Sequence, residues 1–332
     1  MRVVCCIIIL YTLTVGFFSP ASGSGVTNDK LEWLFEIRGV QKTHSFNRPQ
    51  GMFLDSSQKK VYIADTDNRE IAVFSFSGDP SSSDPQSTGR MVADAAIFQT
   101  DRPLSCPIGI AADSKGKIYI SFREKEFLEV FDAKGKFLYP VPSPEFLKEH
   151  TFSAGKFVLS PEGNLYVINR KTDEIYAFEQ NGSFAFRFGG KGSGNGKFQL
   201  ITDIFFQGEK IYLTDAQAIP VQVFTSLGKY LYSFGKHGQG AEDFSFPQAV
   251  SVDRYQRIWV ADAFRHRVRV YNQKGNFLFG FGSYGTEAGR FCFPVDLDFD
   301  GQDRIYILEK SGNRFQVFQV EGNKAQGEKK KM

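Results

Sequence analysis

The segment Val61-Tyr62-Ile63-Ala64-Asp65 decides the fold, because similar segments recur along the chain. The six copies are residues 61–65, 118–122, 165–169, 211–215, 258–262 and 305–309. Their aromatic residues lie at positions 62, 119, 166, 212, 259 and 306, so the spacing is 57 residues once and 46 or 47 thereafter. Such a regular period indicates a repeat architecture in which each copy is one structural unit.

Each copy contains four short apolar runs separated by polar turns. In the fifth copy the runs are residues 249–252, 258–260, 268–271 and 277–281. They are too short for useful helices and rich in β-branched and aromatic residues, which predicts strands. Four strands in a repeat of about 45 residues are typical of a propeller blade. We therefore predict an all-β fold, a six-bladed β-propeller of four-stranded antiparallel blades.

The two ends of the repeat region predict how the ring closes. The sixth copy has only three strands, the last of them at residues 315–318, whereas residues 31–37 form an unassigned strand near the N-terminus. We predict that residues 31–37 pair beside residues 314–320 and complete the last blade. This pairing would leave no open sheet edge at the seam.

The remaining segments set the domain boundaries. Met1-Arg2 and the apolar run 3–18, followed by Ser19-Pro20-Ala21, have the pattern of an export signal and are short for a membrane span. We predict a signal peptide at 1–23, a short linker at 24–30, the propeller at 31–320 and a flexible basic tail at 321–332. The protein is then exported, periplasmic or extracellular, without stable membrane insertion after cleavage; retention of the signal as an anchor is the alternative.

The composition argues against some classes of function. The chain carries 40 Lys+Arg against 37 Asp+Glu, a formal charge of +3, which argues against binding nucleic acid or anionic lipid through bulk charge. The 35 Phe suit the wedge-shaped gaps between radiating sheets. Two insertions interrupt the repeat: residues 77–85 read as a loop, and Ser143-Pro144-Glu145 predicts the start of a short helix.

Several segments resemble the NHL repeat. They are residues 46–52 with 61–69, residues 244–249 with 259–268, and the linking runs 188–198 and 234–240. The resemblance covers about residues 31–320 and implies a six-bladed propeller. It implies no single activity, because propellers of this kind host many functions.

The NHL pattern has an aspartate at the end of the second strand. Asp65, Asp215 and Asp262 keep it, whereas Phe122, Asn169 and Glu309 replace it. We predict that these aspartates accept hydrogen bonds from nearby backbone N–H groups.

The sequence offers no evident cofactor site. Exported NHL-type amidating lyases carry, by family pattern, a histidine beside the proline that opens the inner strands, and no histidine follows Pro49, Pro107, Pro247 or Pro294. Residues 298–303 fit a hairpin turn better than a calcium loop. We predict no cofactor, although a central-channel calcium or other ion is compatible with any propeller.

The two cysteines outside the signal are predicted to stay unpaired. Cys106 and Cys292 fall on equivalent inter-blade loops two blades apart, well beyond the reach of a disulfide.

The candidate binding residues are cations on one loop face. They are Arg123, Arg170, Lys310, Arg265, His266, Lys236 and His237. Two functions remain open. In the first, an exported, non-enzymatic scaffold binds an envelope or secreted protein, and no nucleic acid, through this face. In the alternative, a lyase or hydrolase has its site at the central channel mouth, with or without a metal.

Overall fold

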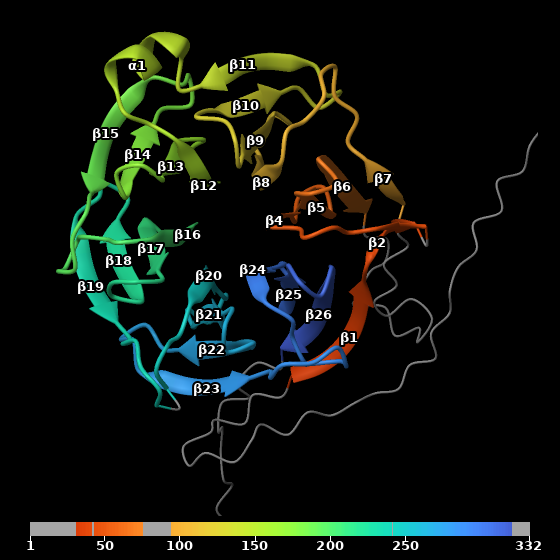
Figure 1. Ribbon diagram of the computed structural model, residues 1–332, viewed down its shortest axis with the longest axis vertical. Coiled ribbons are helices and arrows are strands. Elements are labelled where there is room, and N and C mark those ends of the chain that lie inside the picture. The colour runs from red at the N-terminus through yellow and green to blue at the C-terminus, as the bar shows by residue number, and fades with distance from the viewer. Residues whose placement is uncertain (1–30, 42, 76–93, 241, 321–332) are drawn as a thin grey trace, which may run out of the picture.

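The computed structural model describes residues 31–41, 43–75, 94–240 and 242–320. It contains six four-stranded antiparallel sheets arranged as a ring around a central channel (Figure 1). The predicted six-bladed propeller is therefore confirmed. The predicted signal, the linker at 24–30, the loop at 77–85 and the basic tail lie outside the described residues.

The first three blades follow chain order from the inner strand outward. Blade 1 contains β4 (Gly51–Asp55), β5 (Lys60–Asp65), β6 (Glu70–Ser75) and β7 (Ala95–Ile97). Blade 2 contains β8 (Pro107–Ala112), β9 (Ile118–Phe122), β10 (Leu128–Phe131) and β11 (Phe137–Val141). Blade 3 contains β12 (Ala154–Leu159), β13 (Leu165–Asn169), β14 (Glu174–Phe178) and β15 (Phe184–Gly189).

The next two blades repeat this order, and the last one differs. Blade 4 contains β16 (Ile201–Gln207), β17 (Lys210–Asp215), β18 (Val221–Thr225) and β19 (Tyr230–Phe234). Blade 5 contains β20 (Pro247–Val252), β21 (Ile258–Asp262), β22 (Arg267–Tyr271) and β23 (Phe277–Phe281). Blade 6 contains β24 (Pro294–Phe299), β25 (Arg304–Glu309), β26 (Arg314–Val320) and, from the N-terminal side, β1 (Leu31–Ile37).

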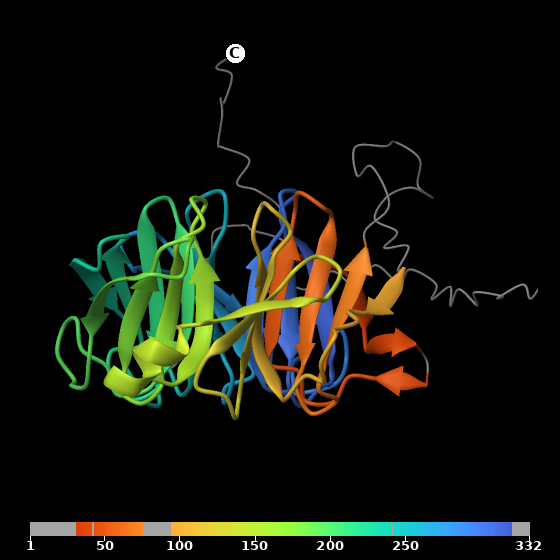
Figure 2. The ribbon, with the colours of Figure 1, turned by 90° about the horizontal axis from the view of Figure 1, so that it is seen from above.

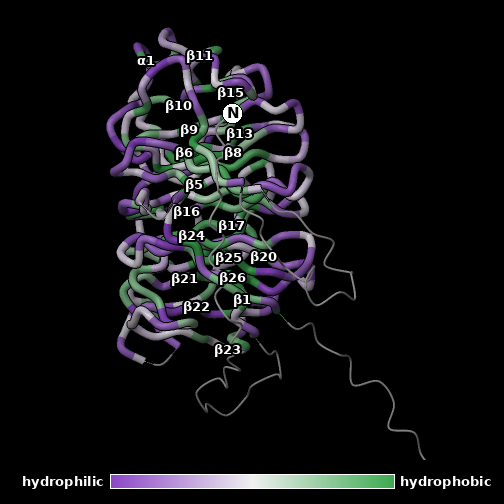
Figure 3. Tube along the Cα trace, turned by 90° about the vertical axis from the view of Figure 1, so that its right-hand side faces the viewer, coloured by the Kyte–Doolittle hydropathy of each residue, from purple (hydrophilic) through white to green (hydrophobic). Residues whose placement is uncertain are grey.

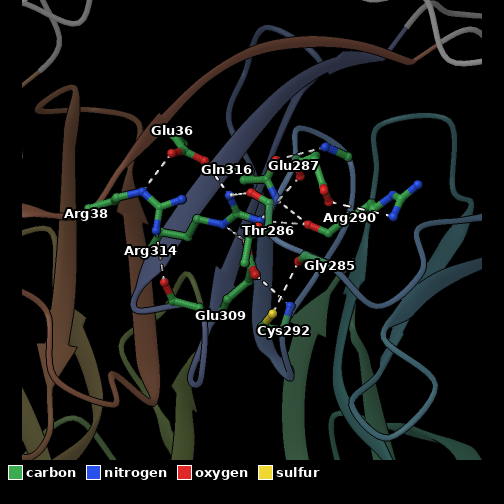
Figure 4. A network of polar contacts seen from close by, with 12 residues as sticks. Glu36, Arg38, Gly285, Thr286, Glu287, Arg290, Cys292, Glu309, Arg314 and Gln316 are labelled. Carbon is green, nitrogen blue, oxygen red and sulfur yellow. Dashed lines mark hydrogen bonds and ion pairs between the residues drawn. The ribbon is translucent and has the colours of Figure 1, made fainter.

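The ring closes as predicted. β1 pairs antiparallel with β26, from Leu31 opposite Val320 to Ile37 opposite Phe315. A buried network joins the two strands (Figure 4). In it, Arg314 donates to Glu36 of β1 at 2.5 Å and to Glu309 of β25 at 2.6 Å. Hydrogen bonds and ion pairs thus fasten the N-terminal strand to the last blade.

The core lies between neighbouring blades. One aromatic position recurs in the third strand of each blade, and its side chain is buried in all six. The residues are Phe74, Phe131, Phe178, Phe224, Tyr271 and Phe318. Edge-on, hydrophobic positions run through the middle of the ring and hydrophilic positions gather at both loop faces (Figure 3). The aromatic repeat therefore forms inter-blade packing.

The strands run between two loop faces (Figure 2). We call the face with the turns between first and second strands the turn face; these turns are at 56–59, 113–117, 160–164, 208–209, 253–257 and 300–303. The opposite connection face carries the turns between second and third strands and the inter-blade connections. The short hairpin of β2 (Gly39–Gln41) and β3 (His44–Ser45) precedes blade 1.

The predicted helix is present on the connection between blades 2 and 3. α1 (Pro144–Glu149) begins with Ser143, whose hydroxyl accepts from the Phe146 N–H, and has proline in its first turn. Within the described ranges, no helix has the length and apolar character needed to cross a membrane.

Candidate functional site

Three charged side chains meet inside the channel. The inner strands share one register. Lys156, Asp203 and Asp296 are the third residues of β12, β16 and β24, and Gly51, Gly109 and Ala249 hold the equivalent position in blades 1, 2 and 5. The Lys156 ammonium of blade 3 lies 3.2 Å from Asp203 Oδ1 and 3.1 Å from Asp296 Oδ2. It also donates to the Val295 carbonyl at 3.0 Å. Because blades 3 and 6 are opposite each other in a six-membered ring, Lys156 spans the channel.

The two carboxylates also join neighbouring blades. Asp203 of blade 4 accepts from the Val250 N–H of blade 5, and Asp296 of blade 6 accepts from the Met52 N–H of blade 1, each at 2.9 Å. Buried charges persist only when they are paired and hydrogen-bonded in this way. The cluster therefore has a structural role at the channel centre.

The electrostatics of the cluster follow from burial and from its internal charges. Burial lowers the pKa of Lys156, but Asp203 and Asp296 outweigh that effect and raise it above its ordinary value. Burial raises the pKa values of Asp203 and Asp296, and the Lys156 ammonium opposes the rise. The lysine therefore stays charged at neutral pH.

Asp298 occupies the same inner strand two residues beyond Asp296. Its Oδ1 accepts from the Ser251 hydroxyl at 3.1 Å and from the Phe299 N–H at 2.8 Å. Its Oδ2 accepts no hydrogen bond from any described residue. Burial, together with the nearby Asp296 and Asp203, raises the pKa of Asp298 to about 7. This carboxyl can gain or lose a proton near neutral pH.

The charged residues described above form the floor of a cavity of about 450 Å³, which reaches the turn face. Its lining includes Lys156, Asp203, Asp296 and Asp298. Apolar side chains of four blades form its wall, and they are Phe53, Ala111, Val158 and Phe205. Residues of the first-to-second strand turns form a polar rim that includes Asp55, Ser57, Asp113 and Ser160. A cavity of this size with a few convergent polar groups suits a small organic molecule.

Two of the cations predicted from the sequence meet on the connection face. Arg123 lies 3.1 Å from Asp67, and Arg48, which was not predicted, lies 3.7 Å from the same carboxylate. Burial and the charges of Arg48 and Arg123 lower the pKa of Lys310. Arg48, Asp67, Arg123 and Lys310 therefore form one cluster of blades 1, 2 and 6.

The other predicted cations are engaged within the fold. Arg170 donates to the carbonyls of residues 122, 123 and 125, and Arg265 donates to the Gly238 carbonyl at 2.6 Å. Lys236 lies 3.5 Å from Asp243.

The two predicted histidines also lie within the fold. His266 Nδ1 accepts from the Phe293 N–H. The Nε2 of His237 is buried and has no partner among the described residues. Of the seven predicted binding residues, the structure brings only Arg123 and Lys310 into the cluster with Asp67.

The aspartates at the ends of the second strands accept backbone hydrogen bonds, as predicted. Asp215 accepts from the N–H groups of Gln199, Leu200, Gln217 and Ala218, and Asp65 and Asp262 make equivalent bonds. Residues 300–303 form a hairpin turn. Cys106 and Cys292 are buried free thiols. In the part of the chain that the structure describes, no three His, Cys, Asp or Glu side chains are arranged to hold a metal ion.

The sequence reasoning missed Lys156, Asp203, Asp296 and Asp298. A signal was present, because charged residues at the same inner-strand register interrupt otherwise apolar runs. The pattern could not show that the closed ring brings Asp203 of the neighbouring blade and Asp296 of the opposite blade within 4 Å of Lys156.

Comparisons with known proteins agree on the fold. A family model described as a 6-bladed beta-propeller matches residues 153–217 and 197–266. A search of the curated proteins finds no match. Solved structures match across most of the chain.

A gluconolactonase from Xanthomonas campestris has a TM-score of 0.62 at 11% identity, over 91% of this chain and 94% of that one. A calcium-binding protein, regucalcin, from Agrobacterium tumefaciens has a TM-score of 0.58 at 15% identity, over 88% and 96%. A virginiamycin B lyase from Staphylococcus aureus has a TM-score of 0.55 at 11% identity, over 88% and 99%. At these identities the likeness shows the fold alone.

Proposed function

We propose that the chain is an enzyme of the lyase or hydrolase class that acts on a small organic molecule in the channel cavity. One observation carries the proposal: the cavity wall includes Asp298, whose pKa is about 7 and whose Oδ2 accepts no hydrogen bond from the described residues. Strongly shifted carboxyl groups in cavities mark acid–base sites.

The lining indicates the class of substrate. The apolar wall suits an apolar body, whereas the floor and rim are acidic apart from Lys156. Because carboxylates outnumber cations there, the cavity favours a neutral or cationic molecule over an anion. A polar group of that molecule would approach Asp298 at the floor.

The residues divide into two roles. Asp298 accepts a proton from the substrate or donates one, and its pKa near 7 makes both forms available at neutral pH. The Lys156 ammonium already faces two carboxylates and a carbonyl. Lys156 is therefore a positioning residue that fixes the inner strands around the site.

The compared structures support an enzyme over the scaffold that the sequence favoured. Two of the three are named as enzymes, a gluconolactonase and a lyase. The match with this chain covers 94% and 99% of their lengths. The third is named as calcium-binding, so calcium is a variable in the assay.

A panel of lactones and aryl esters, with and without added calcium, tests the proposal. We expect the wild-type protein to turn over at least one compound and Asp298→Asn to be slower by about 100-fold or more, as for loss of an acid–base group. Asp132→Asn, which removes a carboxylate from an outer turn of blade 2, should leave the rate unchanged. Equal rates for wild type and Asp298→Asn, or no turnover of any compound, would contradict the proposal.

We also propose that the propeller is of the NHL type and that the protein is exported. The backbone contacts of Asp65, Asp215 and Asp262 support the first point. The apolar run 3–18 with its small-residue exit supports the second. N-terminal sequencing of protein recovered outside the cytosol should begin near residue 24; a chain that keeps Met1 and stays in the cytosol would contradict export.

A further inference from the structure

A second cluster of charged groups lies on the connection face, in the turns and connections of blades 1, 2 and 6. The cavity opens on the opposite face. Arg48 and Arg123 share the single carboxylate of Asp67, at 3.7 and 3.1 Å. The Lys310 ammonium has no hydrogen-bond or ion-pair partner among the described residues. The cluster therefore carries three cations against one anion.

This excess of positive charge has a cost that Asp67 relieves only in part. Lys310 is half-buried, and its pKa is lowered first by burial and then by Arg48 and Arg123. Like charges held close together in a partly dehydrated place destabilise the protein unless an anion joins them. The arrangement thus favours the approach of a further negatively charged group.

The backbone of this cluster is strained at two equivalent places. Arg48 has φ of 52° and precedes Pro49, which lies two residues before β4. Phe293 has φ of 62° and precedes Pro294, the first residue of β24. Positive φ is unfavourable for a bulky residue, and such strain gathers at ligand sites. The connections into blades 1 and 6 therefore share this backbone conformation.

An aromatic surface adjoins the cations. The Lys310 ammonium lies 6.0 Å from the centre of the Phe293 ring, and the Phe264 ring centre lies 5.4 Å from that of Phe293. Phe264 is 55% exposed and also contacts Phe246 at 4.5 Å between ring centres. An exposed aromatic ring close to a cation without an ion-pair partner suits a ligand that is apolar at one end and anionic at the other.

We propose that Arg48, Arg123, Lys310, Phe293 and Phe264 form a binding site for a small organic anion, a carboxylate or phosphate attached to an aromatic or apolar body. The anion lies against Lys310 and the two arginines, and the body lies on the phenylalanine rings. Its charge requirement is opposite to that of the cavity, so the two sites take different molecules.

Calorimetric titration of the full chain with benzoate and with phenyl phosphate tests this site. We expect saturable one-to-one binding that weakens as salt is added, because charged groups make the contact. Benzyl alcohol, which lacks the charge, should not bind, and inorganic phosphate, which lacks the ring, should bind more weakly. The stronger of the two anions identifies the head group.

Two variants and a matched control distinguish binding at this specific site from nonspecific electrostatic attraction to the protein surface. Lys310→Gln should weaken binding by about tenfold or more, as for loss of a charged donor. Phe264→Ala should reduce the preference for phenyl phosphate over inorganic phosphate. Lys236→Gln removes the same charge from an 80% exposed lysine on the same face and should leave affinity unchanged.

Three results would overturn the inference: no saturable binding of either anion, unchanged affinity in Lys310→Gln, or an equal loss in Lys236→Gln. Asp298→Asn should leave this affinity unchanged. Failure here is therefore distinguishable from failure of the proposed enzymatic function.

Discussion

At the scale of single residues, the channel centre depends on Lys156. Its ammonium offsets the negative charge of Asp203 and Asp296. Burial raises the pKa values of both carboxyls, and the lysine opposes this rise without cancelling it. Removing one partner of a buried ion pair leaves an uncompensated charge, which costs more than the pair contributed.

Lys156→Met should therefore lower the free energy of unfolding by roughly 3–5 kcal/mol at pH 7. Without the lysine, the folded-state pKa values of both carboxyls rise further above the unfolded value. Such groups stabilise the fold below the unfolded pKa and lose that contribution as pH rises through the folded pKa. The loss should accordingly be smallest near pH 4 and largest at neutral pH.

Denaturant unfolding at several pH values checks this expectation. Lys134→Met, at an exposed lysine in an outer turn, is the control and should change stability little at any pH. The ion-pair account would be contradicted if Lys156→Met lowered the free energy of unfolding only slightly, or if that decrease grew as the pH was lowered.

At the scale of elements, β1 is the strand that closes the ring. Leu31 and Trp33 of β1 pack in one apolar cluster with residues of blade 6. Its polar contact with that blade is made by Glu36, which accepts from Arg314 at 2.5 Å and also from Arg38 at 2.7 Å. Arg314 is buried and also donates to the carbonyls of Thr286 and Arg290. Glu36 is thus the one carboxylate of β1 in the network of Figure 4.

Glu36→Gln should lower stability by roughly 1–2 kcal/mol, because a charge-assisted hydrogen bond to a buried arginine becomes a neutral one. Glu32→Gln on the same strand is the matched control, since Glu32 forms no ion pair with any described residue. Thermal unfolding should rank wild type and Glu32→Gln together, above Glu36→Gln. Equal shifts in both variants would mean that the Glu36–Arg314 contact adds nothing to the backbone pairing and apolar packing of β1.

The elements were largely predictable from the sequence, for a physical reason. Strand, turn and closure depend on local apolar alternation and on a period that repeats six times, so errors in one copy are corrected by the others. The Ser143 cap and the aspartate contacts were predictable too, because both act over a few residues.

The site was much less predictable. Lys156 and Asp296 are 140 positions apart in sequence, and their contact exists only because blades 3 and 6 face each other across the channel. Likewise, the sequence predicted that Arg170 and Arg265 lie on the same loop face, but it could not show that their guanidinium groups donate to backbone carbonyls.

At the scale of the whole molecule, the ring separates two chemical environments. The turn face leads to an acidic cavity with an apolar wall, and the connection face carries the excess cations of Arg48, Arg123 and Lys310. Lys156 lies between them and spans the channel. A chain of nearly neutral net charge thus carries local regions of opposite charge on its two faces.

The central claim is that the closed ring creates an acid–base carboxyl at the floor of the cavity. A ¹³C NMR titration of the side-chain carboxyls, with Asp298→Asn used to assign the signal, tests it most directly. The account predicts that the Asp298 carboxyl titrates with a pKa of about 7, because burial and the nearby Asp296 disfavour its charged form. A pKa near 4, the ordinary value for an aspartate, would contradict it.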